Sequence, residues 1–361
     1  MKVGVITFQR SVSYGAFLQC LALQNSLAAL GHTVEIIDYH PAHRARKAGL
    51  MRSARFGIFA KSNVLRLIQM RKFALATKQY LMLTSRRFES ADDLNEIGNE
   101  FDAIICGSDQ IWNASHTGGT FDPAYFADFA ADGVRRISYA ASLGGSDISP
   151  ADRADFKLLA GKMNVVSLRE ESGKRLAEEL LQVKCYQMPD PTFLFDGFSQ
   201  LARPPKINRP YIFSFRMQKT KIGDALLAAA ANRYNADVIH VRDNMEISVN
   251  NFTKVIPDPA EWLGLIASAE HVVTNSFHAL ALSIILGRPF SVYGLTGGAQ
   301  SRSERLTSLL KTFALDDLYC ENVGDVSDVV SRAGEINWSD VNEKRRVEQA
   351  RGLGCITSAL S

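Results

Sequence analysis

The 361-residue chain lacks several features that would mark a specialised class of protein. No stretch approaches the roughly 18 consecutive apolar residues that span a bilayer, so we expect no membrane-spanning segment. The five cysteines are an odd number at wide spacing without a CxxC pair, which argues against a disulfide framework and a structural zinc site. The amino-terminal MKVGVITFQ lacks the long apolar region and cleavage site of a secretion signal, and we therefore expect a cytoplasmic protein.

The chain also has little net charge, with 41 Lys and Arg against 38 Asp and Glu. A surplus of +3 does not indicate a protein that coats nucleic acid. Hydrophobic residues make up 46% of the sequence and charged residues 22%, which is typical of an ordinary globular protein. The length predicts two domains or one large α/β domain.

One segment breaks this uniformity. Residues 41–90 contain twelve Lys or Arg and one acidic residue, Glu89, which leaves the remainder of the chain at −8. Aromatic and aliphatic residues are interleaved with these cations. The pattern is compatible with a basic amphipathic helix that rests on anionic lipid or an anionic acceptor, or with a solvated helical excursion that covers a sheet edge.

The first part of the chain alternates between strand and helix patterns. Residues 2–8 predict a buried strand, 16–30 a helix ended by Gly31, and 33–39 a second strand, which together form a βαβ unit. Such a crossover implies a parallel sheet with helices on its faces. Further strands are predicted at 102–106, 136–141, 165–169 and 183–187.

A proline-containing stretch, 197–210, is the predicted linker, and a second alternating series follows it. We predict two Rossmann-like doubly wound α/β domains facing a cleft: 1–196 with a basic helical insertion at 41–90, then 211–340, then a C-terminal helical segment at 341–361. Ligands of open α/β sheets bind at the carboxyl ends of the strands, so the cleft is the expected site. The predicted elements of the second series are strands at 211–216, 238–241, 271–275 and 289–293 and helices at 221–234, 259–269 and 279–287.

The turn after the first strand, Gln9 to Gly15, contains neither GxGxxG nor GxxxxGK[ST]. A dinucleotide or a P-loop triphosphate is therefore not indicated. The free N–H groups of the helix that follows would suit an anion or a sugar hydroxyl near Tyr14 and Gly15. A plain strand-to-helix turn is the alternative.

Two polar clusters follow predicted buried strands. The first concentrates hydrogen-bonding side chains and a flat aromatic ring, a mixture that suits a sugar: Ser108, Asp109, Gln110, Trp112 and Asn113. Its alternative is a helix cap with Trp112 as a core anchor. The second cluster, Ser276, Phe277 and His278, opens a helix, where a histidine can bind an anion or act as a general acid near neutral pH.

A glycine-rich loop, 294–305, brings Arg302 and Arg305 after the next predicted strand. A guanidinium on a flexible backbone is suited to phosphate or carboxylate. The alternative is a surface loop with one arginine paired to Glu304.

Taken together, these residues resemble the polysaccharide pyruvyltransferase family, which transfers a pyruvyl group from phosphoenolpyruvate to a sugar as a ketal. The resemblance covers nearly the whole chain, with GSDQIWN (107–113) and SFHALALSIILGRPF (276–290) as its specific motifs and YGAFLQ and SLREESG as weaker ones. The family fold is similar to the GT-B glycosyltransferases. Ser13 stands where the family often has Asn, and Ser276 stands where an arginine can contact the donor.

The resemblance implies a transferase of exopolysaccharide biosynthesis with phosphoenolpyruvate as donor, no cofactor and no metal. It implies a proton donor or phosphate partner at His278, and Asp109 as the residue that orients or deprotonates the acceptor hydroxyl. Because phosphoenolpyruvate carries about three negative charges, cations must meet them, and we expect Arg169, Arg302 and Arg305, with Ser276 and Phe277, on the donor side. The expected acceptor-side residues are Tyr14, Gly15, Ser108, Gln110, Trp112 and Asn113.

The expected acceptor is a sugar or a lipid-linked glycan, with contact at the inner face of an anionic membrane as one use of the basic segment. Two other classes stay open. A nucleotide-sugar-dependent GT-B glycosyltransferase would share the architecture, although its donor domain usually offers a carboxylate to the ribose, which SFHALA lacks. A noncatalytic relative of the fold is the other.

Overall fold

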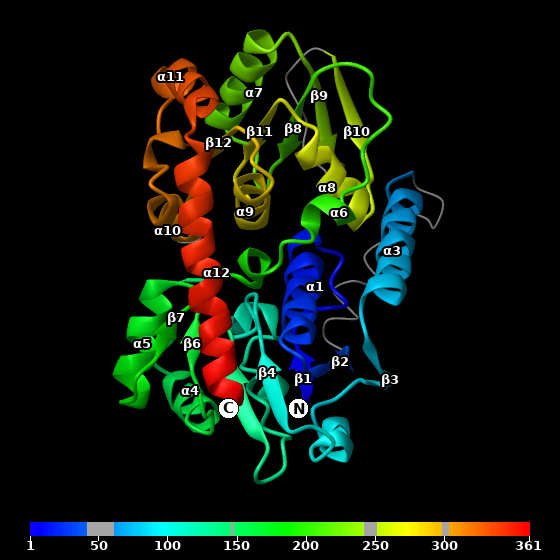
Figure 1. Ribbon diagram of the computed structural model, residues 1–361, viewed down its shortest axis with the longest axis vertical. Helices are drawn as coiled ribbons and strands as arrows, with labels where there is room; N and C mark the ends of the chain where they lie inside the picture. The colour runs from blue at the N-terminus through cyan, green and yellow to red at the C-terminus, as the bar shows by residue number, and fades with distance from the viewer. Residues whose placement is uncertain (42–60, 146–147, 242–250, 298–302) are drawn as a thin grey trace. The chain divides into compact units, whose positions relative to one another are not determined.

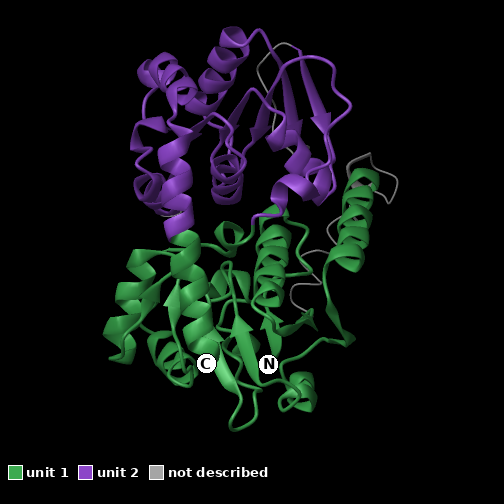
Figure 2. Cartoon of the chain, viewed as in Figure 1, with its two compact units in different colours: residues 1–195, 348–361 green, residues 196–347 purple. Residues whose placement is uncertain are grey.

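The computed structural model describes residues 1–41, 61–145, 148–241, 251–297 and 303–361, and side chains from residue 64 onward in the helix that begins at Lys61. The chain divides into two compact units (Figure 2). Unit 1 comprises Met1–Phe195 and Glu348–Ser361, and unit 2 comprises Asp196–Val347. Within the described ranges, no helix has the length and apolarity that crossing a membrane requires.

Unit 1 is built on a five-stranded parallel sheet with the strand order β3-β2-β1-β4-β5, extended by the short parallel pair β6 and β7 (Figure 1). This is the order of a doubly wound sheet that begins with a βαβ unit. The strands are β1 (Lys2–Ile6), β2 (Thr33–Tyr39), β3 (Leu83–Phe88), β4 (Ala103–Cys106), β5 (Arg135–Ser138), β6 (Ser167–Leu168) and β7 (Tyr186–Gln187). The helices are α1 (Tyr14–Ala29), α3 (Lys61–Tyr80), α4 (Arg153–Ala160) and α5 (Glu171–Leu181), with short 3₁₀ helices at Asp92–Ile97, Ala114–His116, Pro123–Phe126 and Pro191–Leu194.

Helix α1 begins where the sequence provides a cap and is enclosed on nearly all sides. The side chain of Ser13 accepts a hydrogen bond from the backbone N–H of Ala16, which satisfies one of the free donors of the first turn. The ring of Tyr14 packs 5.0 Å from the ring of Phe73 on α3. Because α1 packs between other elements, it is apolar around most of its circumference.

Unit 2 contains a six-stranded sheet, and each of its strand pairs is parallel, in the order β10-β9-β8-β11-β12-β13. Its strands are β8 (Tyr211–Phe215), β9 (Asp237–Val241), β10 (Phe252–Val255), β11 (His271–Thr274), β12 (Phe290–Tyr293) and β13 (Tyr319–Cys320). Its helices are α6 (Phe198–Leu201), α7 (Lys221–Arg233), α8 (Pro259–Ala267), α9 (Phe277–Ile285), α10 (Glu304–Phe313) and α11 (Val326–Arg332), with 3₁₀ helices at Asp316–Leu318, Val323–Asp325 and Ala333–Glu335. Helix α12 (Trp338–Leu360) begins in unit 2 and ends in unit 1.

The boundaries differ from the expected ones in two places. The predicted linker 197–210 belongs to unit 2, where α6 forms and the side chain of Phe198 is fully buried. The predicted helical segment 341–361 is one helix with the residues before it, and its last part belongs to unit 1. There Arg351 donates a hydrogen bond to the carbonyl oxygen of Gln187, and Gln349 donates one to that of Leu194.

Candidate functional site

The GSDQIWN motif begins at the carboxyl end of β4, and its glycine is required by the backbone. Gly107 has a φ of 131°, and a Cβ at this position would collide with the carbonyl oxygen of Tyr139. Asp109 has a φ of 74°, a left-handed conformation that aspartate tolerates better than most residues. The turn therefore holds Asp109 at the carboxyl edge of the unit 1 sheet, where part of it remains exposed.

Ser108, which was predicted on the acceptor side, uses its polar groups inside the protein. Its N–H donates to Oε1 of Gln19 over 3.0 Å, and its hydroxyl donates to the carbonyl oxygen of Ala140 over 2.6 Å. Its carbonyl oxygen accepts a hydrogen bond from the hydroxyl of Thr7. Ser108 is fully buried, so it anchors the turn.

Trp112, also predicted on the acceptor side, has a side chain that forms part of the core. Only 1% of the residue is exposed, and its ring stacks on that of Phe126 at a centroid distance of 4.9 Å. Its indole N–H donates to the carbonyl oxygen of Tyr125. A ring covered on this scale has no face for a sugar, and the core-anchor alternative describes it.

In the first turn, Tyr14 and Gly15 are buried and Tyr14 packs on Phe73, which favours the alternative of a plain strand-to-helix turn. Gln110 and Asn113 remain partly exposed. The amide of Asn113 donates a hydrogen bond to Oε1 of Gln110 over 2.9 Å. Of the predicted acceptor-side residues, Asp109, Gln110 and Asn113 are the partly exposed ones.

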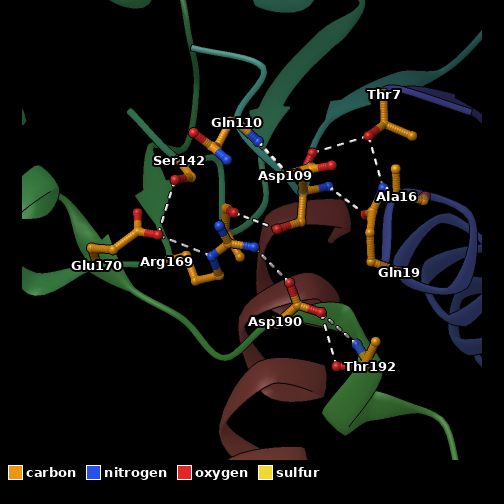
Figure 3. A network of polar contacts seen from close by, with 12 residues as sticks. Thr7, Ala16, Gln19, Asp109, Gln110, Ser142, Arg169, Glu170, Asp190 and Thr192 are labelled. Carbon is orange, nitrogen blue, oxygen red and sulfur yellow. Dashed lines mark hydrogen bonds and ion pairs between the residues drawn. The ribbon is translucent and has the colours of Figure 1, made fainter. Parts of the chain in front are cut away.

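Arg169 follows β6 directly and is held by carboxylates (Figure 3). Its Nε contacts Oε1 of Glu170 and its Nη1 contacts Oδ2 of Asp190, each at 3.0 Å, and the arginine side chain is 3% exposed. Burial lowers the pKa of the guanidinium, but Glu170, Asp190 and Asp109 raise it by more than burial lowers it. The pKa of Arg169 therefore lies above its usual value. The structure thus places the Arg169 charge in an internal ion-pair network of unit 1.

The second cluster lies at the carboxyl edge of the unit 2 sheet. Ser276 is the N-cap of α9, yet its side chain makes no capping hydrogen bond, while its N–H donates to the hydroxyl of Thr274. Phe277 and His278 form the first turn of α9, and their rings meet edge to face at 5.2 Å. Phe277 is buried, whereas the His278 side chain is partly exposed.

The glycine-rich loop is described only in part. Arg305 lies in the first turn of α10 and is partly exposed. Arg302 falls outside the described residues.

Sequence reasoning missed Arg216, which directly follows β8. Its side chain is fully buried and its Nη1 donates to Oδ1 of Asp224 over 2.8 Å. Among the residues that the structure describes, its Nε and Nη2 find no hydrogen-bond acceptor. An arginine placed directly after a buried strand, as Arg169 also is, was the available signal, but Arg216 was included in the predicted strand 211–216.

The backbone around Arg216 is tied to the start of α9. The N–H of Met217 donates to Oδ1 of Asn275 over 2.7 Å, and the amide of Asn275 donates to the carbonyl oxygen of Gln218 over 2.9 Å. The carbonyl oxygen of Phe215 accepts a hydrogen bond from the hydroxyl of Thr274. Arg216 and the α9 N-terminus therefore come from adjacent strand ends, where ligands of parallel sheets bind.

The hydrogen-bond donors at this edge suit an anion. Across the described part of the chain, no group of three or more His, Cys, Asp or Glu side chains is placed to hold a metal ion. Guanidinium N–H groups and the free N–H groups of a helix start are donors that match phosphate and carboxylate oxygens.

A comparison of the sequence with family models matches residues 14–295 to the polysaccharide pyruvyl transferase model. The chain belongs to the polysaccharide pyruvyl transferase family. The matched range contains both predicted clusters, Arg169 and Arg216. No curated protein matches the chain.

Solved structures similar to this polysaccharide pyruvyl transferase family member have the same architecture at low identity. A UDP-GlcNAc 2-epimerase from Neisseria meningitidis, bound to UDP-GlcNAc, has a TM-score of 0.53 and 11% identity, with 100% of this chain and 99% of that chain covered. The MnaA protein of S. aureus, in a structure with UDP, has a TM-score of 0.52 and 10% identity over 97% and 91% of the two chains. The glycotransferase of kitacinnamycin has a TM-score of 0.51 and 9% identity over 100% and 99%.

These similarities show the fold alone. Two parallel α/β sheets and the GT-B neighbours confirm the predicted GT-B-like fold class for this family member.

Proposed function

We propose that this protein transfers the pyruvyl group of phosphoenolpyruvate onto two hydroxyls of a sugar, as a ketal. A proton adds to the methylene carbon, one sugar hydroxyl attacks the central carbon, phosphate leaves, and the second hydroxyl closes the ring. Two hydroxyl protons are released, one of which balances the proton gained by the methyl group, while the other is taken up by the leaving phosphate. The steps require a proton donor, a base and an anion site, and the proposal includes no cofactor.

The observation that carries the proposal is the buried guanidinium of Arg216. Its two N–H-bearing nitrogens without an acceptor in the described chain are donors for an anion, since leaving a buried charge unsatisfied costs several kcal/mol. Lys219 also approaches Asp224, at 3.6 Å, so two cations share this carboxylate. A donor with about three negative charges is the family's expected substrate and matches this surplus.

Roles for the two candidate catalytic residues follow from where they lie. His278 is partly exposed in the first turn of α9, so we assign it the proton donor or phosphate contact on the donor side. Asp109 is partly exposed at the edge of the other sheet, with its Oδ1 held by the N–H of Gln110, so we assign it to the acceptor hydroxyl. Arg305 and Ser276 remain proposed donor contacts, and Gln110 and Asn113 proposed acceptor contacts.

Phosphate release from phosphoenolpyruvate is the direct test. We expect release only when a sugar acceptor is present, across a panel of galactose, mannose, glucose and N-acetylhexosamine derivatives. Release that never depends on acceptor, or no release with any member of the panel including lipid-linked and polymeric forms, would contradict the proposal. It would leave the noncatalytic relative as the better description.

A nucleotide-sugar-dependent glycosyltransferase is the second candidate, because the similar solved structures include proteins bound to UDP or UDP-GlcNAc. Thermal stabilisation separates the two. We expect phosphoenolpyruvate to raise the unfolding temperature and UDP-sugars to leave it unchanged, because bound ligand stabilises the folded state. The reverse result would favour the glycosyltransferase.

The acceptor we propose is a sugar of a polysaccharide or of its lipid-linked precursor, and the proposed location is the cytoplasm. Both would be tested by fractionation of cells that make the product.

A further inference from the structure

Helix α3 is apolar on two opposite sides. Its inner side packs on α1: Phe73, Ala76 and Thr77 are buried, and the ring of Phe73 lies 5.0 Å from that of Tyr14 and 6.5 Å from that of Phe17 (Figure 1). Tyr80 continues this side with a ring contact to Phe17. These contacts account for one side of the helix.

The outer side carries aliphatic residues that this packing leaves exposed. Val64, Leu67 and Ile68 are 41–43% exposed, and Leu75 is 58% exposed. At about 100° per residue these four positions fall on one face of the helix, opposite Phe73. Met82, 57% exposed, follows just beyond the end of the helix. Exposed aliphatic side chains gathered on one helix face mark an interaction surface, whereas scattered ones do not.

The same face is basic. Arg71 and Lys78 are exposed at positions seven residues apart, between and beyond the aliphatic residues, and Lys72 lies beside them. Residues 41–88 contain no Asp or Glu, so no acid of this segment offsets the cations. A face that carries both cations and exposed aliphatic side chains can bind an anionic membrane, because the headgroups attract Lys and Arg while the aliphatic side chains leave water.

We infer that the outer face of α3, defined by Val64, Leu67, Ile68, Arg71, Leu75 and Lys78, docks the protein on an anionic lipid bilayer. A second copy of the chain fits this face less well, because a two-fold interface would place like charges against one another. A soluble acidic glycan would pair with the cations but would leave the aliphatic side chains in water. A bilayer meets both requirements, because its headgroups pair with Arg71 and Lys78 and its acyl region covers the aliphatic side chains.

This inference goes beyond the proposed function and holds whether or not that function is correct. The inference combines the two alternatives for the basic segment. One side of α3 covers α1, and the other side is the membrane face. Docking would bring a lipid-linked sugar to the protein, but the inference requires only an anionic surface.

The test is sedimentation of the full chain with vesicles of phosphatidylcholine alone or with phosphatidylglycerol added. We expect binding to the anionic vesicles that weakens as salt rises, and little binding to the neutral ones. Arg71→Gln should weaken binding about fivefold, and adding Lys78→Gln about fivefold again. Leu67→Gln with Leu75→Gln should also reduce binding, because the acyl contact is lost.

A matched control is the pair Lys157→Gln and Leu158→Gln, which removes one exposed cation and one exposed leucine from α4 of the same unit. We expect this pair to bind as the unchanged protein does, with circular dichroism reporting a folded chain for all variants. Equal binding to neutral and anionic vesicles, or unchanged binding in both α3 pairs, overturns the inference. A concentration-dependent dimer that the α3 substitutions abolish would also overturn it. So would binding to soluble dextran sulfate that is as strong as binding to vesicles and is unchanged by Leu67→Gln with Leu75→Gln.

Discussion

Two buried arginines follow strands in the two units, and their surroundings are opposite. Arg169 in unit 1 faces Glu170 and Asp190 at 3.0 Å and also interacts electrostatically with Asp109, so one cation lies among three carboxylates. Among the described residues, Arg216 in unit 2 pairs with one carboxylate, Asp224, which Lys219 also approaches. Counted over the described residues, the local charge is therefore negative at the first position and positive at the second.

Under the proposed function, this difference separates a structural arginine, Arg169, from a ligand-binding one, Arg216. Arg169 pairs with two carboxylates that unit 1 buries, and we propose that the neighbouring Asp109 serves a sugar hydroxyl. Arg216 has donors to spare for an anion. We therefore expect changes at the unit 1 network to lower stability and changes at the unit 2 edge to lower activity.

The largest expected effect lies at the unit 2 edge. His278→Gln should lower kcat by about 10²- to 10⁴-fold, because proton transfer by a positioned side chain contributes about that much. The measurement is phosphate release with a responsive acceptor. His116→Gln, a partly exposed histidine of unit 1, is the control and should retain activity. Full activity of the His278 variant would remove this residue from the mechanism.

The next effect is on stability in unit 1. Arg169→Met should lower the free energy of unfolding by about 3–5 kcal/mol at pH 7, because Glu170 and Asp190 would stay buried without their cation. Urea unfolding measures it. Adding Asp190→Asn should recover part of the loss, since one uncompensated charge is then gone. If Arg169→Met leaves stability unchanged and abolishes activity, Arg169 is a functional residue, and the expected contrast between the two arginines is wrong.

At Arg216 we expect the opposite separation. Arg216→Met should lower kcat/KM for phosphoenolpyruvate about 10²- to 10³-fold, as the loss of a charge-stabilising donor does, while Lys219 still accompanies Asp224. Arg209→Met, which removes an exposed arginine paired with Asp237, is the control. If Arg216→Met unfolds the protein, Arg216→Lys still tests the idea, because it retains the charge and loses the planar fork. Unchanged kcat/KM in this variant and unchanged stabilisation by phosphoenolpyruvate would contradict the assignment.

The last prediction concerns how the stability of unit 2 depends on pH. Burial, with a smaller contribution from Arg233, lowers the pKa of His271 in β11 to about 3 from its ordinary 6.5. Below pH 6.5 the unfolded chain takes up a proton at this histidine and the folded chain does not. The free energy of unfolding should therefore fall by up to about 1.4 kcal/mol per pH unit between about pH 6.5 and pH 3.

His271→Gln should make that acid slope shallower by this amount, measured by urea unfolding at a series of pH values. An identical slope in both proteins would show that His271 does not remain neutral.

The sequence predicted the central strands well and the edges poorly. Thr33–Tyr39 was expected at 33–39, and β4, β8, β9, β11 and β12 were each expected within one residue at either end. These strands are buried and apolar, so their patterns are strong. β3 and β10 were missed because they are edge strands with exposed, polar residues, LTSRRF and FTKV.

The site was predicted as two separate motifs. The residues after β4 and before α9 lie at strand ends, as expected from the position of ligands in parallel sheets. Ser108 and Trp112 were assigned to the acceptor because polar and aromatic residue types do not reveal whether their groups are already satisfied. The structure shows that Gln19, Ala140 and Tyr125 satisfy them.

The sequence by itself determined the family, the alternation of strand and helix in both units, and the places where chemistry-bearing residues leave their strands, because hydrophobic periodicity and local motifs are properties of neighbours along the chain. Only the tertiary structure decided which of those residues are already paired. Whether a buried guanidinium meets three carboxylates or one depends on side chains brought from distant segments, as Asp190 is to Arg169, and no local pattern encodes that meeting.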